Sequence, residues 1–170
     1  CAAVLLAATL KFEGELTLQL QGNGPVRLLV AQCTDDFRVR AVARYDAARL
    51  ERLDGGFRDL AGEGQVTVTV ETRRSGARYQ GIVPLVGDSL AASLEHYFGT
   101  SDQVPTVVRL AAGDAAAAGM LVQRMPSGGG NAGADDAAAA VAREQEADLT
   151  FEVAGAALAG IGADELLLRG

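Results

Sequence analysis

Short segments in which apolar and polar residues alternate dominate the first half of the chain. Residues 15–21 alternate strictly, and Leu16, Leu18 and Leu20 share one side. A period of two is typical of a half-buried β-strand. The same signal predicts four further strands, over residues 26–33, 37–45, 65–72 and 77–86. Segment 26–33 is apolar on both sides in places, which makes it a candidate for a central strand.

The predicted strand over residues 37–45 has one apolar and one basic side. Its alternating residues are Phe37, Val39, Ala41, Ala43 and Tyr45 on one side and Arg38, Arg40 and Arg44 on the other. We expect the arginines on an outer face, where they either bind an acidic segment or are simply solvated. Thr34-Asp35-Asp36 predicts the hairpin turn before this strand. Gly22-Asn23-Gly24-Pro25 predicts another turn, since no Lys-Ser/Thr follows to make it a phosphate loop.

Helical spacing appears in three places. Residues 1–10 form an apolar helix pattern, and residues 46–64 indicate a loop or a short helix. The third place is a short predicted helix for which Asp88 is the expected N-cap. Leu90, Leu94 and Tyr97 or Phe98 share one face of this helix. Gly99 is the expected C-terminal stop of that helix. Two more strands are expected, over residues 106–111 and 120–125.

The composition changes after Pro126, where a glycine-rich stretch predicts a flexible connector over residues 127–131. An alanine-rich helix is expected over residues 134–148, and residues 149–170 should be the least stable ordered part because glycines interrupt them. We therefore expect a domain over residues 1–126 and a connector with a partial helical linker over residues 127–170. The expected fold class is α+β, a twisted and largely antiparallel β-sheet core packed with helices.

Composition and charge narrow the function. The chain has 170 residues and a net charge of −7, which argues against nucleic acid and against anionic membrane surfaces as partners. Its apolar runs are shorter than the roughly 20 residues that span a bilayer. The two cysteines, Cys1 and Cys33, form no CxxC pair, so the sequence indicates neither a zinc site nor a disulfide framework. A reduced, cytoplasmic protein is the simplest interpretation.

Candidate chemistry is sparse. His96, the single histidine, lies near Asp88, Ser89 and Ser93, so a Ser-His-Asp hydrolase is conceivable, but no oxyanion-hole glycine motif surrounds either serine. Cys33 fits a core cysteine. The acidic pairs Asp35-Asp36 and Asp135-Asp136 lack the alternating ligands of a calcium loop and are interpreted as a turn and a helix start. We therefore predict no catalytic, cofactor-binding or metal-ligating residues and no enzymatic activity.

Three stretches of the chain resemble one family, the 33-kDa heat-shock protein family. The main stretch carries Tyr79-Gln80-Gly81, Gly87-Asp88, Leu90-Ala91, Leu94, Tyr97-Phe98, Ser101-Asp102-Gln103 and Pro105-Thr106. The others carry Leu10-Lys11-Phe12 with Gln19 to Pro25, and Gly119 to Pro126. The departures are Asp102, Ala118 and Ala41, which stand where the family usually has Glu, Gly and Gly. The three stretches keep the family's order and span most of residues 5–126.

The resemblance implies an ATP-independent, redox-regulated holdase chaperone of the bacterial cytoplasm that binds unfolding proteins. It also implies parts missing on each side, including a C-terminal domain whose four cysteines bind zinc when reduced. The expected partners are unfolded client proteins, and a homodimer is left open. Two alternatives stand beside this interpretation: a small hydrolase that uses His96, and a scaffold domain that docks on one defined partner.

Overall fold

The computed structural model describes residues 1–10, 13–113 and 117–124, which fall into two units, residues 1–103 and the segment that begins at Val104. The predicted connector, the alanine-rich helix over residues 134–148 and the segment 149–170 lie outside the described residues. The acidic pair Asp135-Asp136 lies outside them too. These expectations, and the domain boundary at residue 126, stay predictions.

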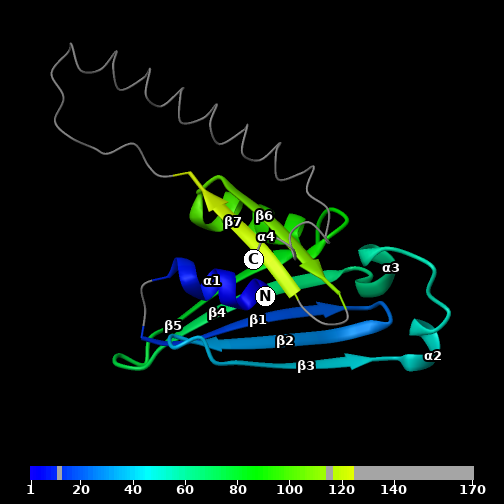
Figure 1. Ribbon diagram of the computed structural model, residues 1–170, viewed down its shortest axis with the longest axis horizontal. Coiled ribbons are helices and arrows are strands. Elements are labelled where there is room, and N and C mark those ends of the chain that lie inside the picture. Colours follow the sequence, from blue (N-terminus) through cyan, green and yellow to red (C-terminus); the bar gives the residue numbers. More distant parts are fainter. Residues whose placement is uncertain (11–12, 114–116, 125–170) are drawn as a thin grey trace, which may run out of the picture. The chain divides into compact units, whose positions relative to one another are not determined.

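The first unit is built on a five-stranded antiparallel sheet with the order β3-β2-β1-β4-β5 (Figure 1). Its strands are β1 (Gly14–Gly22), β2 (Val26–Thr34), β3 (Val39–Tyr45), β4 (Gly64–Thr72) and β5 (Arg78–Pro84). The predicted alternation of β1 is confirmed, because Leu16, Leu18 and Leu20 are only 0, 6 and 3 % exposed. The middle strand is β1, and β2 is an interior strand between β1 and β3.

The register gives the sheet one apolar and one polar face. Directly opposed residues of antiparallel strands project to the same side. Leu18 lies opposite Ala31 of β2 and Val68 of β4, and the rows on either side of this one are also apolar. We call the side that carries Leu18 the apolar face, and the reverse side the polar face. On the polar face Gln32 Nε2 donates to Glu15 Oε1 at 2.6 Å and to Thr17 Oγ1 at 3.1 Å.

Two helices lie on the same side of this sheet (Figure 1). The first, α1 (Ala2–Thr9), buries Ala3 and Leu6 and contacts β1 and β2. The second, α4 (Leu90–Tyr97), packs against β5. Leu94 is 1 % exposed, as predicted, whereas Leu90 is only half-buried.

Gly81 of β5 allows α4 to approach the strand closely. A Cβ atom built on Gly81 would lie 2.4 Å from Cε2 of Tyr97, which is far inside van der Waals contact. The aromatic ring of Tyr97 therefore occupies the space that any other residue at position 81 would need. The Tyr97 ring also meets the Phe98 ring edge to face, with centroids 5.4 Å apart.

Both predicted ends of α4 are wrong by a short distance. The N-cap is Ser89, whose Oγ accepts a hydrogen bond from the Ala92 N–H at 3.1 Å, and Asp88 lies one residue earlier. The helix does not stop at Gly99, because a π-helical turn, η1 (Phe98–Asp102), follows it. Gln103 ends this turn in the left-handed region with φ 54°, so a non-glycine residue takes the role expected of Gly99.

The predicted loop or short helix over residues 46–64 contains two short helices, α2 (Ala47–Leu50) and α3 (Phe57–Ala61). Asp46 caps α2, and its Oδ1 accepts a hydrogen bond from the Arg49 N–H at 3.2 Å. At the start of α3 the direction is reversed: Asp59, in the first turn of the helix, accepts with its Oδ2 a hydrogen bond from the backbone N–H of the N-cap residue Gly56 at 3.1 Å.

The second unit contributes an antiparallel pair, β6 (Thr106–Ala112) and β7 (Ala117–Gln123), which forms a separate two-stranded sheet. The strand predicted over residues 120–125 thus starts three residues earlier and ends at Gln123. Antiparallel strands with a few helices make this an α+β fold, as the sequence predicts.

Candidate functional site

The most exposed part of the sheet is β3, all of whose residues are exposed. The sequence predicts a basic outer face for this strand, but its apolar side is exposed as well: Val39 is 51 % and Tyr45 57 % exposed. The physical reason is position, because β3 is an edge strand, while α1 packs over β1 and β2. Phe37 lies before the strand in a turn, with φ 60°, and is 54 % exposed.

The exposed apolar residues of β3 continue the apolar face of the sheet. Val39 lies opposite Cys33, Ala41 opposite Ala31, and Ala43 opposite Leu29, which is itself 36 % exposed. Alternation along β3 brings Tyr45 to the same side. We call this set the edge strip; its members are Leu29, Val39, Ala41, Ala43 and Tyr45.

The other side of β3 is basic, as predicted. Arg40 and Arg44 project to the polar face, with the exposed Val42 between them. Arg40 Nη2 lies 3.7 Å from Glu15 Oε2, a loose ion pair between partly exposed side chains. For Arg44, no ion pair is present within the described residues.

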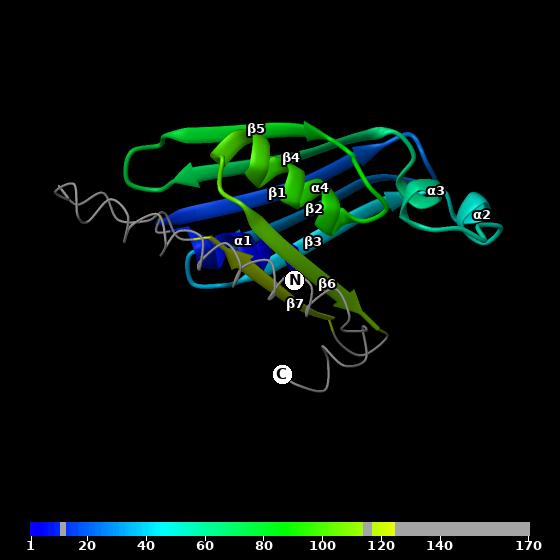
Figure 2. The same cartoon turned by 90° about the horizontal axis from the view of Figure 1, so that it is seen from above.

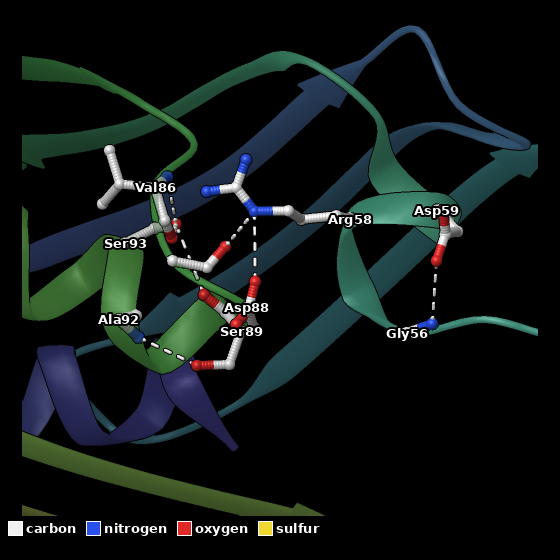
Figure 3. A network of polar contacts seen from close by, with 9 residues as sticks. Gly56, Arg58, Asp59, Val86, Asp88, Ser89, Ala92 and Ser93 are labelled. Atoms are coloured by element: carbon white, nitrogen blue, oxygen red, sulfur yellow. Dashed lines mark hydrogen bonds and ion pairs between the residues drawn. The ribbon is translucent and has the colours of Figure 1, made fainter.

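The residues of the conceivable hydrolase are not assembled into a site, and Figure 3 shows the contacts that Ser89, Ser93 and Asp88 make instead. Ser93 is fully buried, and its Oγ accepts from the Val86 N–H at 3.1 Å and donates to the Val86 carbonyl at 3.0 Å. Ser89 caps the helix, and Asp88 Oδ1 lies 3.1 Å from Arg58 Nε. His96 is exposed, and within the described part of the chain no hydrogen bond joins its ring to a serine. These hydroxyls therefore hold α4 in place.

Cys33 is a core residue, as predicted. It is fully buried, its Sγ contacts the Thr34 carbonyl at 3.6 Å, and burial raises the pKa of its thiol. Because the thiolate is the reactive form, Cys33 should be unreactive in the folded chain. Cys1 is exposed. Among the described residues, no three His, Cys, Asp or Glu side chains come together, so these residues do not fit a zinc ion.

The acidic residues of the β2–β3 turn serve the turn, as predicted. The Thr34 hydroxyl donates to Asp36, whose Oδ2 also lies 2.8 Å from Arg38 Nε. Asp35 Oδ1 accepts from Arg73 Nη2 at 2.9 Å and so ties this turn to the β4–β5 hairpin. A shallow hollow of about 470 Å³ lies there, and the charges that line it are already paired, Arg73 with Asp35 and Arg78 with Glu71.

None of the helices within the described residues has the length and apolar character needed to cross a bilayer. The serine, histidine and aspartate residues are not assembled into a catalytic site, and the charges of the hollow are paired. The best candidate site is therefore the edge strip together with Arg40 and Arg44 on the reverse side of β3. Such a surface, apolar on one side and cationic on the other with an open strand edge between, suits association with another polypeptide.

Comparison with known proteins identifies a family of chaperones that this chain resembles. The family model described as Hsp33 protein matches residues 1–168. The 33 kDa chaperonin of Photobacterium profundum is 47 % identical over 131 residues, which are 75 % of this chain and 44 % of that protein. The 33 kDa chaperonin of Chromobacterium violaceum is 42 % identical over 171 residues, 99 % of this chain and 54 % of that protein.

A solved structure agrees. The 33 kDa chaperonin (heat shock protein 33 homolog) of Thermotoga maritima superimposes with a TM-score of 0.59 at 26 % identity, over 72 % of this chain and 44 % of that one. The chain therefore belongs to the Hsp33 family, as the sequence motifs predict. It spans about half the length of the curated relatives that it matches.

Proposed function

We propose that this chain forms the core of an ATP-independent holdase chaperone, which binds unfolding proteins and prevents their aggregation. The observation that carries the proposal is the edge strip, because holdases need accessible apolar surface and soluble proteins rarely leave such surface without a use. Family membership and the names of the relatives support it. In this proposal the protein is not an enzyme, and its partners are unfolded or partly folded proteins in the cytoplasm.

Redox regulation belongs to the same proposal, but the described residues do not supply the sensor. Cys33 is buried with a raised pKa, and the described side chains offer no zinc site. We place the zinc-binding cysteines in a part of the parent protein outside residues 1–170. Zinc would hold those cysteines in the reduced state, and their oxidation would release it.

The test is light scattering from a heat-unfolding client protein at a fixed ratio of chaperone to client, without ATP. The 170-residue chain should suppress scattering equally in peroxide and in reductant, since neither of its cysteines is placed to act as the switch. Suppression that appears only after oxidation would place a sensor within residues 1–170. Absence of suppression in both conditions would overturn the proposal.

A matched pair of variants connects the activity to the edge strip. Val39→Ser with Tyr45→Ser makes two exposed members of the strip polar, and we expect a clear loss of suppression. The control, Tyr79→Ser, changes a side chain of β5 that is 52 % exposed and should leave suppression unchanged. Equal losses from both variants would show that apolar exposure in general matters, rather than this strip.

The scaffold alternative predicts one defined partner instead of many clients. Suppression tested against several unrelated client proteins separates the two, because a scaffold would protect at most one of them.

A further inference from the structure

Within the five-stranded sheet of the first unit, no strand pairs with the outer edge of β3, and the register shows which of its residues face that edge. In an antiparallel pair, opposed residues alternate between exchanging both backbone hydrogen bonds and exchanging none. The Thr34 N–H donates to the Arg38 carbonyl at 3.0 Å, so the Thr34–Arg38 pair is of the bonded kind. The alternation continues along the strand, so the backbone groups of Arg40 and Val42 are hydrogen-bonded to β2. Val39, Ala41 and Ala43, which lie between and beside them, direct their N–H and C=O groups away from β2.

The hydrogen bonds of β2 follow the same alternation. The Asp35 N–H donates to the Gly14 carbonyl at 3.1 Å, so Cys33, Ala31 and Leu29 bond to β1. Their neighbours Gln32 and Val30 are left to bond β3, as the assignment above requires. Val39, Ala41 and Ala43 thus present donors and acceptors along the outer edge of β3. Figure 2 shows β3 as the end strand of the five-stranded sheet.

The opposite edge of the sheet, β5, lacks a donor at one of its outward positions, although Ile82 and Gln80 face outward there as well. The Leu85 N–H donates to the Gly64 carbonyl at 2.9 Å, so residue 84 faces outward, and Pro84 has no N–H to offer there. β3 contains no proline, and the residues with outward backbone groups are Val39, Ala41 and Ala43, whose small apolar side chains do not obstruct an incoming strand.

We propose that β3 captures an extended segment of alternating apolar and acidic residues, which adds to the sheet as a sixth strand. The segment's apolar side chains would cover the edge strip, and its carboxylates would lie beside Arg40 and Arg44 on the polar face. This inference rests on the proposed function and names the class of client segment that the surface takes. Half-buried strands with acidic outer sides, released when a protein unfolds, have this pattern.

The direct test is fluorescence anisotropy with a labelled nine-residue peptide of alternating valine and glutamate, long enough to span the seven residues of β3. The full 170-residue chain should bind it with a Kd that rises with salt. A peptide of the same composition with its valines and glutamates in two blocks should bind at least about tenfold more weakly, because it cannot satisfy both sides of the strand. Equal binding of both peptides would overturn the proposal.

A matched pair of substitutions tests the backbone. Ala41→Pro removes an N–H that faces the open edge and leaves the bonds to β2 intact, so it should abolish peptide binding with little effect on the fold. Ala41→Val keeps the N–H and an apolar side chain, and it should bind at least as well as the parent. If Ala41→Pro fails to fold, a peptide N-methylated at alternate residues makes the same test on the unchanged protein. Unaltered binding of the methylated peptide would overturn the proposal.

Charge supplies the specificity test. Arg40→Glu with Arg44→Glu should weaken binding of the valine–glutamate peptide and improve binding of its valine–lysine counterpart. We expect the ratio of the two Kd values to shift by about tenfold or more, because like charges on neighbouring strands repel. An unchanged ratio would show that the arginines do not select the partner.

The failure of this inference can be distinguished from the failure of the proposed function. Suppression of client aggregation without peptide binding would overturn the inference and leave the chaperone proposal intact. Peptide binding without suppression would do the reverse. If sedimentation shows that Ala41→Pro converts a dimer to a monomer while no peptide binds, a second copy occupies the edge, and the proposed client segment is wrong.

Discussion

Strands β1 and β3 belong to one sheet and both contribute to its apolar face, but the side chains of β1 on that face are buried and those of β3 are exposed. In β1, Leu16, Leu18 and Leu20 are almost completely buried, while in β3 more than half of the Val39 side chain is exposed. Both strands show the same alternation in the sequence. The difference teaches that alternation determines which side chains share a face, while the position of a strand in the sheet determines whether anything covers them.

The largest expected effect comes from truncating matched positions of the two strands. Leu16→Ala leaves a cavity in the core and should lower the free energy of unfolding by about 2–5 kcal/mol. Val39→Ala should change it by less than about 0.5 kcal/mol, because Val39 is solvated. Urea denaturation of both variants measures the contrast. Similar losses at the two positions would show that the edge strip is covered in solution.

The second prediction concerns the covered side of β5. Gly81→Ala brings a methyl group into the Tyr97 ring and should destabilise the chain by about 1–3 kcal/mol. Gly99→Ala is the control, since nothing lies within 4 Å of a Cβ at that position. Thermal unfolding followed by circular dichroism compares them, and a neutral Gly81→Ala would mean that α4 does not lie as close to the sheet as described.

A smaller effect tests the start of α4, the helix that covers β5. Ser89→Ala removes the N-cap and should cost about 1 kcal/mol. Asp88→Ala removes only an exposed ion pair with Arg58 and should cost less than about 0.5 kcal/mol. Chemical denaturation of the two variants decides between the observed cap and the one expected from sequence; the reverse order of costs would restore Asp88 as the cap.

The smallest effect lies in the turn that leads into β3. The hydrogen bond from the Thr34 hydroxyl, aided by Arg38, lowers the pKa of Asp36. A carboxylate with a lowered pKa in the folded state stabilises it above the unfolded pKa of about 3.9, and that contribution is lost as the pH falls through the folded value. The Asp36→Asn variant should therefore have a lower free energy of unfolding than the parent at neutral pH, and the difference between the two should shrink as the pH falls below about 4. A difference that stays constant with pH would contradict this assignment.

Local patterns predicted most of the fold. The five strands of the large sheet, the helix at Ala2–Thr9 and the core position of Leu94 follow from periodicity and turn residues. Errors arose where two neighbouring residues compete for one role. Asp88 and Ser89 are both good N-cap residues; Ser89 caps the helix, and Asp88 lies one residue earlier and pairs with Arg58.

The candidate site was harder to predict, because it depends on strand order. The sequence predicted the basic side of β3 correctly, but an interior strand and an edge strand share one alternation. A signal was present nonetheless. Ala41 and Ala43 contribute little apolar area to a core. On the other side of the strand, arginines lie two residues before and two residues after Val42, which suits a strand solvated on both faces.

The strand order also has a consequence for folding kinetics. β1, β2 and β3 are joined by tight turns, whereas the pairing of Gly22 in β1 with Gly64 in β4 must close the chain over the whole intervening segment. Long-range closure of this kind is slow compared with hairpin formation. In a nascent chain that has emerged only as far as β3, the edge of β1 is therefore still open, although β1 becomes the middle strand of the sheet once β4 and β5 have paired. The protein is most prone to self-association in that interval, so its own early folding intermediate presents the same hazard that its proposed clients do.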